Sequence, residues 1–247
     1  MKITIRRKID TLYAFEVKPE LNQELWIGDS SPKPEVKDRL MAIVTDFMEK
    51  IDIRGVEIKD VIITGSLANY NWSKYSDIDL HILINFSDVD ENVELVKRFF
   101  DAVRSNWNKV HDIRIKGYEV ELYMQDEHES HASTGVYSLL KDDWVVKPQQ
   151  ENPEIDETNE NKKAASLMRE IEKLEKMYER TDYAGVQRYG GMLKNKLKKM
   201  RRTGLETGGV FSVENLAFKV LRRSGHMGIL YDTIRKAYDS KMSMTEQ

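Results

Sequence analysis

The spacing of hydrophobic positions predicts helices in both halves of the chain. Apolar residues recur three or four positions apart over residues 36–51 and again over residues 88–107, which places them on one face of a helix. Pro32 and Pro34 precede the first of these helices, and proline is well tolerated in a first helical turn. The second half has stripes of the same spacing, with glycines at positions 204, 208 and 209 expected to separate them. These stripes predict helices over residues 167–178, 186–200, 213–221 and 227–238.

Shorter hydrophobic runs predict strands around the first two helices. One run is continuously apolar up to Gly65, which is typical of a buried strand, and others alternate between polar and apolar residues. Lys116 and Gly117 separate two alternating runs, as expected of a hairpin turn. This order of strands and helices predicts an α+β fold with flanking helices, followed by a C-terminal helical module. The predicted strands are residues 2–6, 13–17, 61–64, 77–84, 113–115 and 118–124.

A polar stretch with two prolines divides the chain. We expect a first domain at residues 1–148, a linker at 149–161 and a helical domain at 162–247. Charge is distributed unevenly between these parts, because residues 1–150 hold 20 Lys and Arg against 27 Asp and Glu, whereas residues 161–247 hold 19 against 10. The basic C-terminal part could face a polyanion, but the charge alone favours an ordinary solvated helix surface.

Composition excludes several classes of protein. The 247 residues contain no cysteine, which excludes disulfide frameworks, thiol nucleophiles, zinc–thiolate sites and iron–sulfur clusters. Apolar residues make up 40% of the chain, enough for a packed core. Neither a secretory signal nor a membrane span is expected from the distribution of apolar residues. We therefore expect a soluble cytoplasmic protein.

The chemically informative stretch runs from residue 62 to residue 80. A predicted strand ends in Gly65-Ser66, a loop of ten residues follows, and the next strand begins with Asp77-Ile78-Asp79. Side chains two apart on a strand share a face, so the two carboxylates point together and repel each other unless a cation neutralises them. Oxygen ligands of this kind suit Mg²⁺ or Mn²⁺, and a glycine followed by a serine can approach and bind a phosphate. An Asp-x-Asp pair alone is often a solvated edge and Gly-Ser alone is usually a turn, but together they predict a site for a metal ion and a nucleoside triphosphate (NTP).

These residues resemble the signature of the DNA polymerase beta-type nucleotidyltransferase superfamily. The resemblance is specific over residues 61–84 and extends to about residue 125. The amino-acid sequence of the loop also resembles that of phage-encoded nucleotidyltransferases. It implies a mixed sheet and two metal ions held by Asp77, Asp79 and a third acid on a later strand. Glu121 is our first choice for that acid and Glu119 the alternative, although the family more often has Asp there.

The resemblance also implies a reaction. An acceptor hydroxyl would attack the α-phosphorus of an NTP, pyrophosphate would leave, and Ser66 would hold the β- or γ-phosphate. An RNA 3′ end, a protein or a small molecule could be the acceptor. Synthesis of a cyclic or linear oligonucleotide is a sharper version of this function. A module that binds nucleotide or RNA but has lost catalysis is the alternative.

Other polar residues are weaker candidates. His81 shares a strand face with Asp79 and could touch substrate, although a hydrogen-bonded wall residue is the commoner role. His128 and His131 flank Glu129 and could bind a metal, or lie in a solvated loop. Residues 194–202 include six basic residues in nine, so Lys198 could reach the triphosphate or the helix could bind RNA; a solvated helix face is the alternative.

Overall fold

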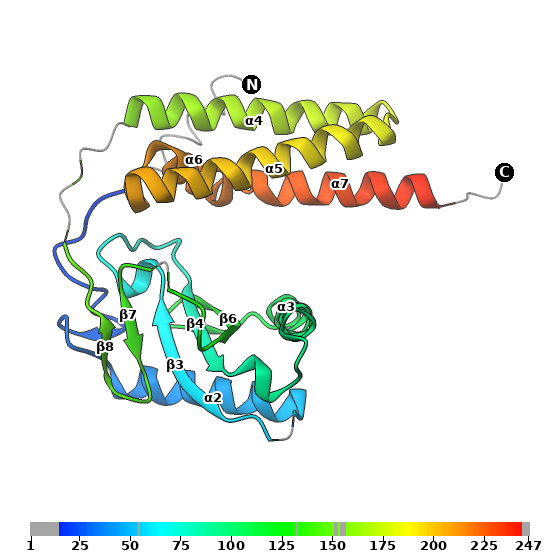
Figure 1. Ribbon diagram of the computed structural model, residues 1–247. Helices are drawn as coiled ribbons and strands as arrows, with labels where there is room; N and C mark the ends of the chain where they lie inside the picture. Colours follow the sequence, from blue (N-terminus) through cyan, green and yellow to red (C-terminus); the bar gives the residue numbers. More distant parts are fainter. Residues whose placement is uncertain (1–14, 54, 132, 151–152, 154–156, 244–247) are drawn as a thin grey trace. The chain divides into compact units, whose positions relative to one another are not determined.

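The computed structural model describes residues 15–53, 55–131, 133–150, 153 and 157–243 of the chain (Figure 1). The chain forms two compact units, one from residues 16–152 and the other from residues 153–247 together with the segment that ends at Phe15. Among the described residues, none of the helices is both long enough and apolar enough to span a membrane.

The first unit is built on a mixed six-stranded sheet with the order β5-β6-β4-β3-β7-β8. Neighbouring strands are antiparallel except β4 and β6, which are parallel. The sheet with its flanking helices confirms the predicted α+β fold. Its strands are β3 (Ile58–Thr64), β4 (Ile78–Ile84), β5 (Arg114–Ile115), β6 (Tyr118–Asp126), β7 (Val136–Ser138) and β8 (Asp143–Val146).

One face of this sheet packs against two helices. The apolar sides of α2 (Pro34–Ile51) and α3 (Val93–Val110) share a core with alternate residues of β3, β4 and β6. Phe47 and Trp107 join the two helices in an edge-to-face contact with ring centroids 5.2 Å apart. Because side chains alternate along a strand, the residues between these core positions point to the opposite face of the sheet.

The parallel pair of strands is connected through α3. Parallel strands cannot be joined by a tight turn, so the chain leaves β4, forms α3 and returns through the β5–β6 hairpin. Lys116 and Gly117, with φ of 51° and 85°, form the turn predicted between β5 and β6. β5 pairs only with the first two residues of β6, and further along this edge the Asn108 side chain of α3 bonds the backbone of Leu122 in both directions, at 3.0 and 3.1 Å.

The described part of the second unit is a bundle of four helices with its own apolar core. Gly204 lies inside α5 rather than between helices. Glycine is needed there because a Cβ would lie 2.5 Å from the Cβ of Glu214 on α6. The predicted break occurs instead at Gly209, where φ is 67°. The helices are α4 (Glu157–Glu179), α5 (Tyr183–Gly208), α6 (Val213–Arg223) and α7 (His226–Met242).

Three expected boundaries differ in the structure: the end of the linker, the start of the first domain and the strand at residues 13–17. α4 begins at Glu157, so part of the stretch expected as a linker is helical. Phe15 packs against the core of the helical unit, whereas the first domain was expected to start at residue 1. The strand expected at residues 2–6 lies outside the described residues, and residues 15–17 of the other expected strand have no regular structure. The short strands β1 (Trp26–Ile27), β2 (Ser31–Pro32), β7 and β8 were not predicted, because they are too short to show a hydrophobic period.

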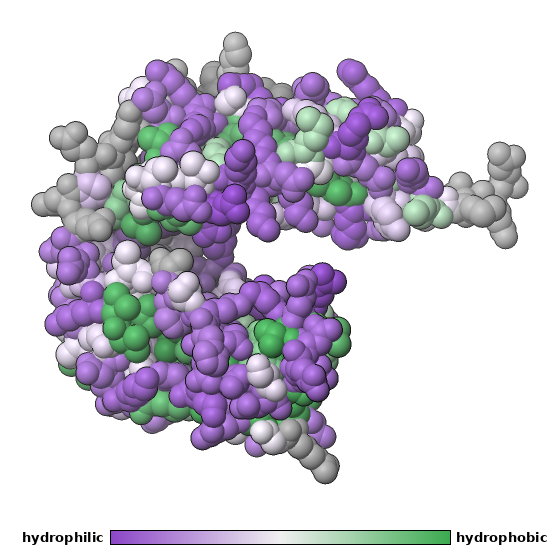
Figure 2. Space-filling model, in the orientation of Figure 1, coloured by the Kyte–Doolittle hydropathy of each residue, from purple (hydrophilic) through white to green (hydrophobic). Residues whose placement is uncertain are grey.

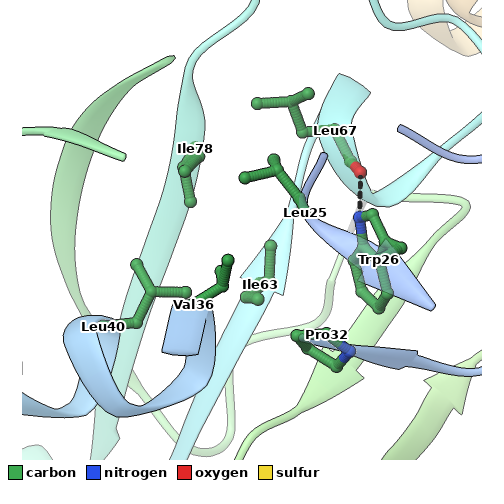
Figure 3. Close-up of a pocket in the computed structure, with 8 residues that line it drawn as sticks. All are labelled: Leu25, Trp26, Pro32, Val36, Leu40, Ile63, Leu67 and Ile78. Carbon is green, nitrogen blue, oxygen red and sulfur yellow. Dashed lines mark hydrogen bonds between the residues drawn. The ribbon is translucent and has the colours of Figure 1, made fainter. Parts of the chain in front are cut away.

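Trp26 anchors the loop that follows β3. Its indole N–H donates to the backbone oxygen of Leu67 over 2.8 Å, and its ring stacks on Trp144 with centroids 4.9 Å apart. A small apolar pocket lies on the core side of this loop (Figure 3). The Trp26 indole N–H and the Leu67 carbonyl oxygen drawn on its wall are bonded to each other, so neither is available to a phosphate. Its lining residues are Leu25, Trp26, Pro32, Val36, Leu40, Ile63, Leu67 and Ile78.

We expect Trp26→Phe to lower the free energy of unfolding by about 1–3 kcal/mol, because it leaves a buried carbonyl oxygen without its donor. Trp72→Phe is the matched control, since the Trp72 indole makes the same kind of bond to Glu20 at an exposed position, where water can replace it. Chemical denaturation of both variants measures the difference. Equal losses would show that the buried hydrogen bond does not anchor the loop.

Candidate functional site

Three carboxylates converge on the face of the sheet opposite the helices. Asp77 immediately precedes β4, Asp79 lies in β4, and the parallel register places Glu121 of β6 directly beside Asp79. One ligand oxygen from each residue can be chosen so that all three lie within 4.8 Å of one another, and all three residues are half-buried. The structure therefore brings together the three acids named as catalytic and metal-binding from the sequence.

Gly65 lies against this cluster and has no room for a side chain. Its φ of 75° and ψ of −160° belong to a region that glycine alone adopts readily. A Cβ at this position would lie 1.8 Å from Oδ2 of Asp79. The glycine is thus required both by the backbone turn and by the position of the carboxylate.

Two serine hydroxyls lie in the same loop, next to the acids. Ser66 begins the short 3₁₀ helix η1 (Ser66–Ala68), and its Oγ donates to Oγ of Ser76 over 2.7 Å. The backbone N–H of Ser73 also donates to Ser76 Oγ, over 3.0 Å. Ser76 was not predicted from the sequence as a site residue, although its place directly before Asp77 was a usable signal.

Aromatic side chains form the next row on this face. His81 of β4 lies beside Tyr123 of β6, and their rings stack with centroids 4.7 Å apart. The Tyr123 hydroxyl donates to Oε2 of Glu121 over 2.5 Å, while Nδ1 of His81 is 2.8 Å from Oε1 of Gln125. Burial lowers the pKa of His81 to about 4, so its ring is neutral at physiological pH. Burial, with the charges of Asp79 and Glu121, raises the pKa of Tyr123, which therefore keeps its proton.

Several other candidates lie outside this cluster. Glu119 points toward Arg114, whose guanidinium is 3.6 Å from its carboxylate. His128 pairs with Asp126, and His131 lies 3.4 Å from the amide of Gln125, so the two histidines and Glu129 form no metal-ligand group within the described chain.

Lys198, predicted to bind nucleotide, lies on the exposed face of α5 in the helical unit. That face is hydrophilic, as is most of the surface visible in Figure 2. Its role at a triphosphate stays a prediction.

The donor set of the cluster fits a hard divalent cation. Carboxylate oxygens are the ligands preferred by Mg²⁺ and Mn²⁺, and three negative groups this close repel one another without a counter-charge. Gly65 leaves space beside Asp79 that any other residue would fill. The residues present therefore fit the metal that the sequence predicted.

Comparisons with known proteins leave the family open. No protein-family model and no curated protein matches the chain. A solved structure, that of the STING-associated CdnE c-di-GMP synthase from Capnocytophaga granulosa, is similar at 13% sequence identity, with 86% of this chain and 83% of that chain covered and a TM-score of 0.20. A TM-score this low carries no argument about function, so the function is inferred from the site itself.

We expect Gly65→Ala to abolish Mn²⁺ binding, because its Cβ must displace the Asp79 carboxylate. Gly117→Ala is the matched control: its φ is also positive, at 85°, but nothing lies within 4 Å of the added Cβ. Both variants should lose about 1–3 kcal/mol of stability from backbone strain. Isothermal titration with Mn²⁺ and thermal unfolding separate the two effects, and retained binding in Gly65→Ala would contradict the close approach.

We expect Mn²⁺ to raise the melting temperature of the wild-type protein and of Glu119→Gln, but to raise that of Glu121→Gln much less. An ion that binds only the folded state at a hundred times its dissociation constant stabilises it by about 2.7 kcal/mol. The two glutamates lie two positions apart on one strand, so the comparison tests the position of the carboxylate rather than the loss of a charge. An equal shift in the two variants would remove Glu121 from the ligand set.

Proposed function

We propose that this protein is a metal-dependent nucleotidyltransferase, which transfers a nucleoside monophosphate from an NTP to an acceptor hydroxyl and releases pyrophosphate. One observation carries the proposal: Asp77, Asp79 and Glu121 converge beside the Gly65-Ser66 turn. This is the arrangement that the resemblance to the DNA polymerase beta-type superfamily implies. We assign catalysis to the unit formed by residues 16–152, which contains all of these residues.

Each residue has a role that follows from its chemistry. Asp77, Asp79 and Glu121 would hold Mg²⁺ or Mn²⁺, which neutralises phosphate charge and lowers the pKa of the attacking hydroxyl. Gly65 lets the backbone approach the triphosphate, and the hydroxyl of Ser66, with Ser76 beside it, is available to the β- or γ-phosphate. A new P–O bond forms to the acceptor oxygen, the bond from the α-phosphorus to pyrophosphate breaks, and the acceptor proton passes to a carboxylate of the cluster.

We further propose that the acceptor is RNA, because of the positive charge of α5. Residues 183–205 contain no acidic residue, and Lys194, Lys198 and Lys199 are exposed there. Lys194 also lies over the exposed ring of Tyr231 on α7, with its Nζ 5.4 Å from the ring centroid. A cationic, partly aromatic surface of this kind suits a nucleic-acid backbone.

The test is transfer of label from α-³²P NTPs in the presence of Mg²⁺ or Mn²⁺, alone, with total RNA and with a protein lysate. We expect transfer by the wild-type protein and by Glu119→Gln. In Asp77→Asn/Asp79→Asn we expect a loss of about a thousand-fold or more, equivalent to roughly 4 kcal/mol of transition-state stabilisation.

The labelled fraction identifies the acceptor. Label in RNA supports the RNA acceptor, label in protein replaces it with a protein, and a small labelled product formed without acceptor indicates oligonucleotide synthesis. Transfer that persists in the double variant contradicts the assignment of the carboxylates. Metal-dependent NTP binding with no transfer under any condition indicates a binding module without catalysis.

A further inference from the structure

The Tyr123 hydroxyl donates to Oε2 of the Glu121 carboxylate over 2.5 Å. Glutamate has three rotatable side-chain bonds, one more than aspartate, so its carboxylate can occupy more positions unless a neighbour holds it. A donor on one oxygen restricts those positions.

The ring that carries this hydroxyl is itself held from two directions. His81 stacks on it from the neighbouring strand, with the two planes inclined by 20°. Arg104 of α3 places its guanidinium 4.7 Å from the ring centroid. The His81 ring is fixed in turn by its hydrogen bond to Gln125. The hydroxyl therefore sits at the end of a packed side chain with little freedom to move.

The backbone between Glu121 and Tyr123 is also fixed. Asn108 accepts from the N–H of Leu122 and donates to its carbonyl oxygen, which closes the edge of β6 at this point. Asn108 and Arg104 lie one turn apart on α3, so the same side of that helix holds both the strand and the tyrosine ring. With ring and backbone both held, the freedom that remains in Glu121 lies in its own side chain.

We propose that Tyr123 is a positioning residue, which presents Glu121 to the metal ion by binding one of its carboxylate oxygens. Glutamate carries its carboxylate one methylene further from the backbone than aspartate does, and the Tyr123 hydroxyl binds the carboxylate at that greater distance. The inference rests on the proposed function, because it takes the three carboxylates as the metal ligands. It assigns a role to Tyr123, which is not itself one of the proposed metal ligands.

The experiment measures Mn²⁺ affinity from the electron paramagnetic resonance signal of the free ion, together with thermal unfolding. We expect Tyr123→Phe to weaken Mn²⁺ binding by about 10–100-fold, as is typical when a partner of a metal ligand is removed. Tyr118→Phe is the matched control. Tyr118 lies on the other face of β6, where its hydroxyl accepts from Asn22 over 2.7 Å, so its loss affects stability but should leave Mn²⁺ affinity unchanged.

A double-mutant cycle distinguishes positioning from a general structural role. Because Tyr123 acts through Glu121, we expect Tyr123→Phe to have no further effect on the residual Mn²⁺ affinity of Glu121→Gln. An equal loss in both backgrounds overturns the proposal, and so does unchanged affinity of Tyr123→Phe when the wild-type protein binds Mn²⁺. If the wild-type protein itself binds no Mn²⁺, the proposed metal site fails first and this inference fails with it.

A second variant tests the same contact from the other side. Glu121→Asp withdraws the carboxylate from the hydroxyl, and we expect weaker Mn²⁺ binding that is insensitive to Tyr123→Phe. Affinity equal to that of the wild-type protein would show that the contact is not needed and would overturn the proposal.

Discussion

The candidate site depends on one constraint, the register of the parallel pair β4 and β6. In this register Asp79 lies beside Glu121, and His81 lies beside Tyr123 in the next row. Side chains alternate between the two faces of a strand, so a slip of one residue would turn Glu121 toward the core and Leu122 toward the acids. The buried residues Val120 and Leu122, packed beneath the helices, prevent that slip. The same hydrophobic contacts that stabilise the sheet therefore fix the position of the carboxylates.

Concentrating negative charge on one face has a cost that the surrounding residues limit. Three carboxylates within 4.8 Å repel one another, and burial strengthens the repulsion because the local dielectric constant is lower than that of water. The row behind them adds no further negative charge, since the raised pKa of Tyr123 keeps its hydroxyl protonated. That hydroxyl donates a hydrogen bond to Glu121, which favours the charged carboxylate. The neutral His81 ring and the protonated Tyr123 hydroxyl thus add no charge of the same sign beside the cluster.

The sequence predicts the elements of this site better than it predicts their contacts. The apolar run before Gly65, the Asp-x-Asp pair and the alternation in residues 118–124 are local patterns, and each appears in the structure as a strand or a turn. The choice between Glu119 and Glu121 depends on register, a long-range property that no local pattern specifies. The hydrogen bond between Tyr123 and Glu121 was not foreseen, although residues two apart on a strand share a face. Strands of two to four residues, such as β1 and β7, were missed because their pairing rather than their composition defines them.

The connection between the two parallel strands contributes more than continuity of the chain. A parallel pair of strands needs a crossover connection, and α3 is part of it. The apolar side of α3 also covers the core face of the sheet. Its polar residues Arg104 and Asn108 lie along the edge of β6 beyond Val120, whose N–H still donates to the backbone oxygen of Ile113, directly before the two-residue strand β5. An open strand edge is free to shift or to pair with another chain, whereas an edge bonded by a side-chain amide is fixed at that point. Because β5 is short, α3 can reach both β6, which carries Glu121, and the Tyr123 ring, whose hydroxyl binds Glu121. The crossover helix therefore helps to fix the position of the acids on the opposite face of the sheet.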